Sequence, residues 1–266
     1  MTYHSKYPEV RTLIENNINV LLEGGAGSGK STIIKQVAED LSLDFFSISM
    51  TKQTTLNALI GFISINGTYI PSQLRKAVEF GGLVLLDEID AADPNTLLCL
   101  NTLENGYLSC PDGIVQKHEN FRLTATSNPA NEHQIYTGRS KLDAATLDRF
   151  DVVAVPRDNS LELTLTDEDT TNEINLMRTI LSDNSISRTL SMRDCLRYYQ
   201  RKQIGLASDY PATLLVEKHL HAQYLDIFKE QEEEQVKVKR TQSECTTIDE
   251  LWETVLMESN NTKDEL

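Results

Sequence analysis

The residues best suited to chemistry lie in a glycine-rich stretch near the N-terminus. Residues 20–32 read VLLEGGAGSGKST and contain the spacing G-x-x-x-x-G-K-S. In such a loop the backbone N–H groups surround phosphate oxygens, the lysine reaches the β- and γ-phosphates, and the serine hydroxyl binds Mg²⁺. The sequence therefore predicts a site for a nucleoside triphosphate. The predicted binding residues are Gly24, Gly25, Ala26, Gly27, Ser28, Gly29, Lys30, Ser31 and Thr32.

Two carboxylates follow a second informative stretch. Residues 82–86, GLVLL, are typical of a buried parallel strand, and Asp87 and Glu88 come directly after them. Ligands of open α/β sheets bind at the carboxyl ends of the strands, so both side chains can face the glycine-rich loop. We expect Asp87 to help Ser31 bind Mg²⁺ and Glu88 to polarise the attacking water. The alternative is a strand that simply ends in solvated acids.

Two further polar residues stand beside predicted strands. Asn128 follows the strand candidate 121–127, where its amide can contact the attacking water or the γ-phosphate. Taken by itself, Asn128 is better explained as a turn residue before Pro129. Arg149 precedes the apolar run 151–155 and can reach the nucleotide of a neighbouring subunit as an arginine finger. A surface arginine in an ion pair is the alternative, and Arg139 is the second candidate for the finger.

These side chains need a sheet and helices to bring them together. The apolar run 18–22 predicts a buried strand before the loop, and apolar residues at helical spacing over 33–41 predict a helix after it. We therefore predict an α/β fold with a parallel sheet flanked by helices over residues 1–157. Residues 158–230 are expected to form a linker and a small α-helical lid. Residues 231–266 are expected to form an acidic tail with a short amphipathic helix.

Composition limits the classes of partner. The net charge of −15 disfavours a general electrostatic grip on nucleic acid, which needs clustered lysine and arginine. The four cysteines form no C-x-x-C pair, which favours reduced thiols over disulfides or zinc. No apolar run approaches the length of a membrane span, and no signal-peptide pattern opens the chain. We expect a cytoplasmic protein that does not bind membranes.

The order of these motifs over residues 10–230 resembles that of the AAA+ ATPases. The resemblance implies that the nucleotide is ATP with Mg²⁺, and that a helical lid folds over it. It also implies a second sensor arginine at the start of a lid helix. Arg193 matches that position, with Ser191 as a helix N-cap, and Arg188 lies close by in the sequence.

Two predicted hairpins indicate one branch of these ATPases. Alternating apolar residues surround Asn-Gly within residues 61–70, and residues 107–116 surround Pro-Asp-Gly. Both inserts, together with the phrase GGLVLLDEIDAADPNTLL, resemble the MoxR, CobS, McrB and dynein-related group, and MoxR and CobS most. In that group the inserts contact the substrate or flank a central pore, which makes Phe62, Ile65 and Tyr69 candidate contact residues. Packing within a short hairpin is the alternative for each.

The resemblance implies an ATPase that remodels or activates a separate partner protein as a homo-oligomeric, hexameric ring. A protein with a von Willebrand A-type domain, or a metal-insertion complex, is the kind of partner it implies. Catalysis is then expected to rely on Lys30, Glu88, Asn128, Arg149 and Arg193. Two alternatives remain open: a McrB-like nucleic-acid motor, and a nucleotide-dependent scaffold without significant turnover.

Overall fold

The computed structural model describes residues 2–128, 142, 144–186, 188–207, 210–215 and 217–230. The chain divides into two compact units: residues 1–171 with 189–200, and residues 172–188 with 201–266. Arg139 and the predicted acidic tail lie outside the described residues.

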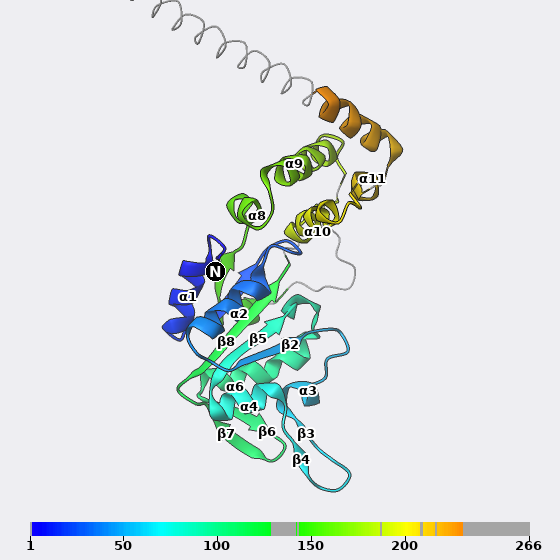
Figure 1. The fold of residues 1–266 in the computed structure, drawn as a ribbon. Helices are drawn as coiled ribbons and strands as arrows, with labels where there is room; N and C mark the ends of the chain where they lie inside the picture. The colour runs from blue at the N-terminus through cyan, green and yellow to red at the C-terminus, as the bar shows by residue number, and fades with distance from the viewer. Residues whose placement is uncertain are drawn as a thin grey trace, which may run out of the picture. The chain divides into compact units, whose positions relative to one another are not determined.

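A five-stranded parallel sheet forms the centre of the first unit, with the strand order β2-β5-β8-β1-β9 (Figure 1). The order is not that of the sequence, because helical crossovers connect the parallel strands. All five strands therefore end at one edge of the sheet, and the loops that follow them meet there. Its strands are β1 (Val20–Glu23), β2 (Phe45–Ser49), β5 (Gly82–Asp87), β8 (Phe121–Ser127) and β9 (Asp151–Ala154).

Apolar residues alternate between the two faces of this sheet. On β1, Val20 and Leu22 pack into one hydrophobic cluster, and Leu21 packs into the other. On β5, Leu83 and Leu85 share the first cluster with Val20. Side chains of a strand point alternately to opposite faces, so near-continuous apolar runs can fill a core on each side.

Helices cover both faces. Helices α1 and α2 contribute Val10, Ile14, Ile33, Ile34 and Val37 to one cluster, whereas α4 contributes Leu74, Ala77 and Val78 to the other. Local sequence sets the ends of α4, because the Ser72 hydroxyl accepts a hydrogen bond from Arg75 N–H and Gly81 adopts φ +91°. The helices of this unit and its junctions are α1 (Tyr7–Glu15), α2 (Lys30–Asp40), α3 (Leu56–Ile60), α4 (Gln73–Phe80), η1 (Ile89–Ala91), α5 (Pro94–Leu97), η2 (Leu98–Leu100), α6 (Asn101–Glu104), α7 (Ala144–Leu147), α8 (Asn159–Leu165), α9 (Glu168–Asp183) and α10 (Met192–Gln203).

Two antiparallel hairpins interrupt the α/β pattern, as the sequence predicts. The first pairs β3 (Phe62–Ile63) with β4 (Tyr69–Ile70) between α3 and α4. The second pairs β6 (Tyr107–Cys110) with β7 (Gly113–Gln116) after α6. Both project from the sheet on the side of α3 and α4 (Figure 1).

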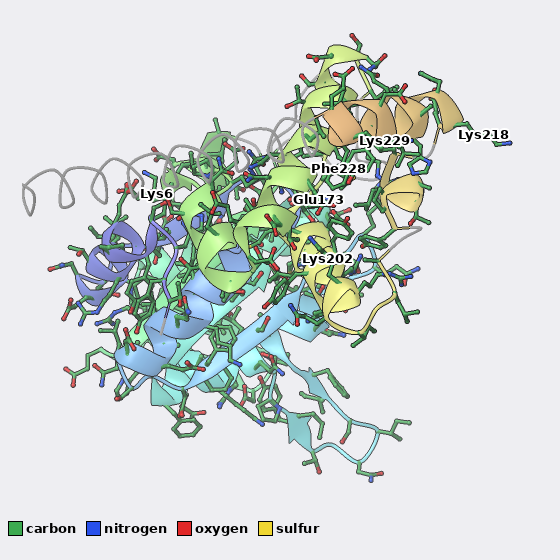
Figure 2. All side chains as sticks on the ribbon, turned by 45° about the horizontal axis from the view of Figure 1, so that its top comes forward. Lys6, Glu173, Lys202, Lys218, Phe228 and Lys229 are labelled. Atoms are coloured by element: carbon green, nitrogen blue, oxygen red, sulfur yellow. The ribbon has the colours of Figure 1, made fainter. Side chains whose placement is uncertain are left out.

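The second unit is helical in its described residues. It holds most of α9, the end of α10, α11 (Tyr210–Leu215) and a helix over residues 218–230. Glu173 of α9 joins α10 and the helix over residues 218–230, because its carboxylate accepts hydrogen bonds from Lys202 Nζ at 2.8 Å and from the Tyr224 hydroxyl at 2.9 Å. Figure 2 shows Glu173 and Lys202 side by side on α9 and α10.

The predicted fold class, a parallel sheet flanked by helices and followed by helices, is confirmed. The compact units divide the chain along a different line from residue 157, since residues 158–171 and 189–200 group with the sheet. Among the described helices, none combines the length and the apolar character that a membrane span requires.

Candidate functional site

The glycine-rich loop connects β1 to α2 at the carboxyl edge of the sheet. Gly27 and Gly29 adopt φ +75° and +93°, conformations that L side chains rarely adopt. Gly24 has a different constraint, because a Cβ added there would lie 2.3 Å from the carbonyl oxygen of Val155. The loop can therefore keep this path only with glycine at these positions.

Lys30 begins α2, and its ammonium group is turned back into the loop. Its Nζ donates to the carbonyl oxygens of Gly24 at 2.6 Å and Gly25 at 3.0 Å, and to Asn128 Oδ1 at 3.1 Å. The side chain is 8% exposed, so these oxygens replace water around the charge. A bound phosphate can replace these oxygens as the partner of the ammonium group at little cost in desolvation, because that group is already shielded from water.

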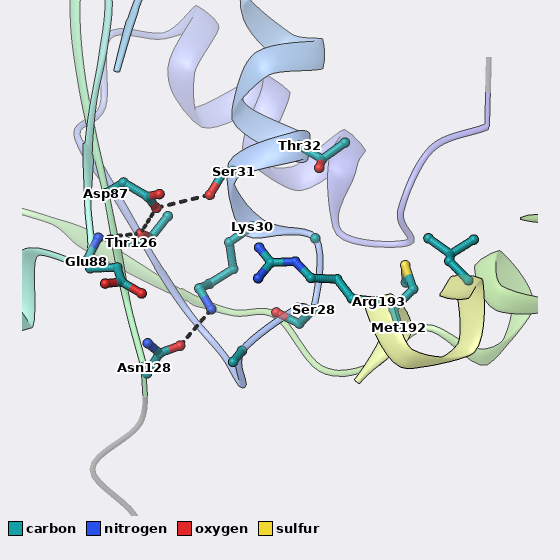
Figure 3. Close-up of a pocket in the computed structure, with 14 residues that line it drawn as sticks. Ser28, Lys30, Ser31, Thr32, Asp87, Glu88, Thr126, Asn128, Met192 and Arg193 are labelled. Carbon is teal, nitrogen blue, oxygen red and sulfur yellow. Dashed lines mark hydrogen bonds between the residues drawn. The ribbon is translucent and has the colours of Figure 1, made fainter. Parts of the chain in front are cut away.

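Asp87 lies at the centre of a hydrogen-bond network that joins three elements (Figure 3). Its Oδ1 accepts from the Ser31 hydroxyl at 3.0 Å and from the Thr126 hydroxyl at 2.5 Å. The same Thr126 oxygen accepts from Glu88 N–H at 2.9 Å. Thr126 therefore fixes the carboxylate of Asp87 and the backbone of Glu88 at once.

Thr126 is a residue of the site that none of the sequence motifs marks. One signal was present, because Thr124 and Thr126 stand two residues apart in a strand that is otherwise largely apolar and buried. They share one face, and both hydroxyls donate to residues of β5, Thr124 to Val84 O and Thr126 to Asp87. Buried hydroxyls need partners, so a pair at this spacing points to a polar neighbour on the adjacent strand.

Glu88 stands in a strained backbone conformation. Its φ is +60° and ψ is +48°, in the left-handed region that non-glycine residues seldom occupy. Such strain is found where the surrounding structure holds a residue for a purpose. Here the turn places the Glu88 side chain in the same pocket as Lys30 and Asn128.

Arg193 reaches the pocket from the start of α10 (Figure 3). Ser191 caps this helix as the sequence predicts: its hydroxyl accepts from Asp194 N–H at 3.4 Å, and Asp194 accepts from Ser191 N–H at 2.9 Å. A Cβ on Gly27 would lie 2.8 Å from Ser191 Cβ, so the cap packs directly on the loop. The residues that line the pocket are Ala26, Gly27, Ser28, Gly29, Lys30, Ser31, Thr32, Asp87, Glu88, Thr126, Asn128, Met192, Arg193 and Leu196.

Arg149 does not lie in this pocket. It precedes β9, which runs parallel to β1 with Asp151 opposite Val20, at the amino edge of the sheet. The four paired residues of β1 and β9 alone separate that edge from the loop by roughly 13 Å. Arg149 forms an ion pair with Glu104 at 2.8 Å, and its side chain is 14% exposed. The structure therefore places it where it cannot serve the subunit's own pocket.

The three candidate contact residues of the first hairpin differ in their exposure and contacts. Phe62 and Ile65 are exposed, and Ile63, which was not among the predicted contact residues, is exposed as well. Tyr69 is a packing residue, because its hydroxyl donates to Ile60 O at 2.5 Å and its ring lies under the Arg75 guanidinium. These contacts agree with the packing alternative for Tyr69.

The donors of the pocket fit a nucleoside triphosphate and a divalent cation. The Ser28 hydroxyl is buried and finds no hydrogen-bond partner in the described part of the chain, which leaves it for a phosphate oxygen. Ser31 Oγ and Asp87 Oδ1 lie 3.0 Å apart. Neighbouring ligands of an octahedral Mg²⁺ with bonds of ~2.1 Å lie at about the same separation.

Sequence comparisons agree with this geometry. Residues 19–150 match the family described as AAA domain (dynein-related subfamily). The chain is 32% identical to midasin of Giardia intestinalis over 49% of its length, and 30% identical to the uncharacterized protein YeaC of Bacillus subtilis over 50%. These matches cover 3% of midasin and 40% of YeaC, so the chain spans well under two thirds of either relative.

A relative that aligns over most of both chains and two solved structures extend the comparison. An uncharacterized protein of Staphylococcus epidermidis is 22% identical over 86% of this chain and 91% of its own. The crystal structure of a proposed ATPase from Cytophaga hutchinsonii has a TM-score of 0.50 at 16% identity and covers 83% of this chain and 80% of its own. NtrX from Brucella abortus in complex with ADP has a TM-score of 0.51 at 18% identity, over 81% and 53%. Both structures share the fold.

Proposed function

We propose that this chain hydrolyses ATP. The proposal starts from the match of residues 19–150 to the AAA domain of the dynein-related subfamily. One observation carries the proposal: the loop, the Asp87–Glu88 pair, Asn128 and Arg193 converge on one pocket. Mg²⁺, held by Ser31 and Asp87, would neutralise charge on the phosphates. ATP rather than another nucleotide is proposed from the family and not from a residue of the pocket.

The residues of the pocket have separate roles in this reaction. Lys30 and Arg193 place positive charge beside the β- and γ-phosphates, where negative charge develops during transfer. Glu88 orients the attacking water in line with the leaving oxygen, and Asn128 holds that water or the γ-phosphate through its amide. Thr126 acts through Asp87 and Glu88, so it is a positioning residue.

The placement of Arg149 supports a shared active site. Since it lies at the opposite edge of the sheet from the pocket, we propose that it completes the site of a neighbouring subunit. Such a head-to-tail contact uses two different surfaces of each subunit, and it forms a ring when the rotation between subunits closes. We propose a hexameric ring of the MoxR or CobS type.

We propose that the ring acts on a second protein. The exposed residues Phe62, Ile63 and Ile65 place apolar area on a hairpin in which Ser64 and Thr68 are joined by backbone hydrogen bonding. Apolar side chains on a projecting hairpin suit contact with a polypeptide better than with nucleic acid, whose backbone demands positive charge. The net charge of −15 favours the same choice. A protein with a von Willebrand A-type domain is the first class to test.

Glu88→Gln tests the proposal. The amide keeps the shape of the side chain and cannot polarise water, so we expect ATP to bind and turnover to fall by at least about a hundredfold. Phosphate release measures turnover, and binding of a fluorescent ATP analogue measures affinity. The Glu88→Gln protein with bound ATP should also retain its partner in a pull-down, which identifies that partner by mass spectrometry.

Glu119→Gln is the matched control, because it makes the same change of charge at an exposed position outside the pocket. It should leave turnover unchanged. If Glu88→Gln turns over ATP at the rate of the unmodified chain, the catalytic role of Glu88 is wrong. If neither protein releases phosphate but both bind ATP, the nucleotide-dependent scaffold is the better description.

A further inference from the structure

We propose that Glu104 is the resting partner of Arg149 and restrains it until a neighbouring subunit presents bound nucleotide. The inference rests on the proposed function, since it assumes that Arg149 acts on the adjacent site. It assigns a role to a residue outside the pocket that no motif in the sequence marks. In this role Glu104 is a positioning residue, because it touches neither the nucleotide nor the reacting water of its own subunit.

The contact joins two segments that are distant in the sequence. Glu104 is the last residue of α6, and Arg149 lies between α7 and β9. Their side chains approach to 2.8 Å between Nε and Oε1. Within the described part of the chain, no other carboxylate pairs with Arg149. Of the described acidic groups, that of Glu104 alone therefore holds the guanidinium.

The hydrophobic core brings the two side chains together. Leu103 and Phe150, the neighbours of Glu104 and Arg149 in the chain, are 4% and 7% exposed and belong to the same cluster. Asn19 fixes the Arg149 backbone further, because its amide donates to Arg149 O at 3.2 Å. Since both backbones are anchored, exchange of partners requires only rotation of side chains.

The strength of the pair suits a restraint that can be released. The Glu104 side chain is 50% exposed, and such pairs contribute little to stability because water competes for the carboxylate. The Arg149 Nε is buried and makes no directed hydrogen bond, although it lies within ion-pair distance. A phosphate that accepts two parallel N–H bonds from the guanidinium binds it more strongly. Nucleotide on a neighbour can therefore displace Glu104.

The position of Glu104 also connects the restraint to the second hairpin. Helix α6 leads directly into β6 and β7 (Figure 1), and Gly106 O accepts from Lys117 N–H at 2.8 Å to close the base of the hairpin. Any force that displaces the hairpin therefore acts on the end of α6 that carries Glu104.

The test compares four proteins at a subunit concentration that only partly saturates turnover: the unmodified chain, Glu104→Gln, Arg149→Ala and the double variant. Glu104→Gln keeps the shape of the side chain and removes its charge. We expect it to raise turnover by about two- to fivefold, the range that release of an exposed ion pair allows. The affinity of single sites for a fluorescent ATP analogue, measured in the Glu88→Gln background, should not change.

The other variants separate the inference from the proposed function. Arg149→Ala should lower turnover at least tenfold, and the double variant should match Arg149→Ala. If Arg149→Ala leaves turnover unchanged, the shared active site and the role of Glu104 are both wrong. If Arg149→Ala lowers turnover but Glu104→Gln lowers it as well or leaves it unchanged, the shared site stands and the restraint is overturned. An increase that persists in the double variant also overturns it, because Glu104 then does not act through Arg149.

Discussion

The ammonium group of Lys30 lies 3.1 Å from Oδ1 of Asn128, across a pocket that joins the start of α2 to the end of β8. These residues stand 98 positions apart in the chain. The contact fixes the orientation of the Asn128 amide, because the carbonyl oxygen faces Lys30 and the NH₂ group is left to face another ligand. Asn128 can therefore donate to the γ-phosphate or order the attacking water, but it cannot act as a base.

Two replacements of Asn128 separate the effect of an added charge from the effect of losing the amide. Asn128→Asp adds a carboxylate beside the γ-phosphate position, so we expect ATP affinity to fall at least tenfold through like-charge repulsion. Asn128→Ala should change affinity little and lower turnover, because the amide is then missing only where it contacts the reacting groups. Equilibrium binding and phosphate release distinguish the two. Equal affinity of both variants would show that position 128 does not lie beside the γ-phosphate.

Thr126 offers a test with a nearly isosteric change. Thr126→Val removes the hydroxyl that contacts Asp87 and Glu88, and we expect turnover to fall by about 10- to 100-fold, the equivalent of ~1.5–3 kcal/mol for a hydrogen bond to a charged group. Thr126→Ser keeps the hydroxyl and should retain most of the turnover. Thermal unfolding of both proteins shows whether the loss comes from unfolding instead. Normal turnover in Thr126→Val would refute the positioning role.

Two adjacent glycines of the loop should respond differently to the same change. Gly24→Ala brings a Cβ to 2.3 Å from Val155 O, so the loop must move and we expect ATP affinity to drop at least tenfold. A Cβ on Gly25 meets no atom within 4 Å, and its φ is not positive. Gly25→Ala should therefore bind ATP like the unmodified chain. Isothermal titration of the two variants tests whether the crowding at Gly24 decides the path of the loop.

Asp158 makes the stability of the sheet unit depend on pH. Burial raises the pKa of its carboxyl, but hydrogen bonds from Ser5 N–H and Leu161 N–H and the nearby His4 outweigh burial and lower the pKa below its ordinary value. The ionised form is thus favoured by folding. The stabilisation is present above the ordinary carboxyl pKa and is lost as pH falls through the lowered value.

Asp158→Asn should remove this dependence. We expect the variant to be less stable than the unmodified chain at pH 7, by about 1 kcal/mol, and to differ from it less at pH 3. Urea unfolding at both pH values measures the two differences. A constant difference between pH 7 and pH 3 would show that the carboxyl is not ionised preferentially in the folded chain.

Much of the site was predictable because its chemistry follows local spacing. The loop at Gly24–Ser31 contains a phosphate-binding motif between a predicted strand and a predicted helix. The Asp87–Glu88 pair follows a strand whose apolar composition indicates that it is buried. Parallel strands share a carboxyl edge, so predicting the strands also brought Asn128 to the same side. Both hairpins were predictable for a similar reason, since their turns contain Asn-Gly or Asp-Gly between alternating apolar residues.

The sequence by itself therefore determined which parts the protein has: a phosphate-binding loop, the carboxylates beside it and the α/β framework. The tertiary structure decided the pairings, because they join side chains that no spacing relates. It made Thr126 the link between Asp87 and Glu88, turned Tyr69 inward beneath Arg75, and set Arg149 against Glu104 at the far edge of the sheet. Strand order controls the Thr126 contact, because β5 and β8 are neighbours in the sheet. The order of a parallel sheet depends on which apolar faces pack together rather than on local propensity.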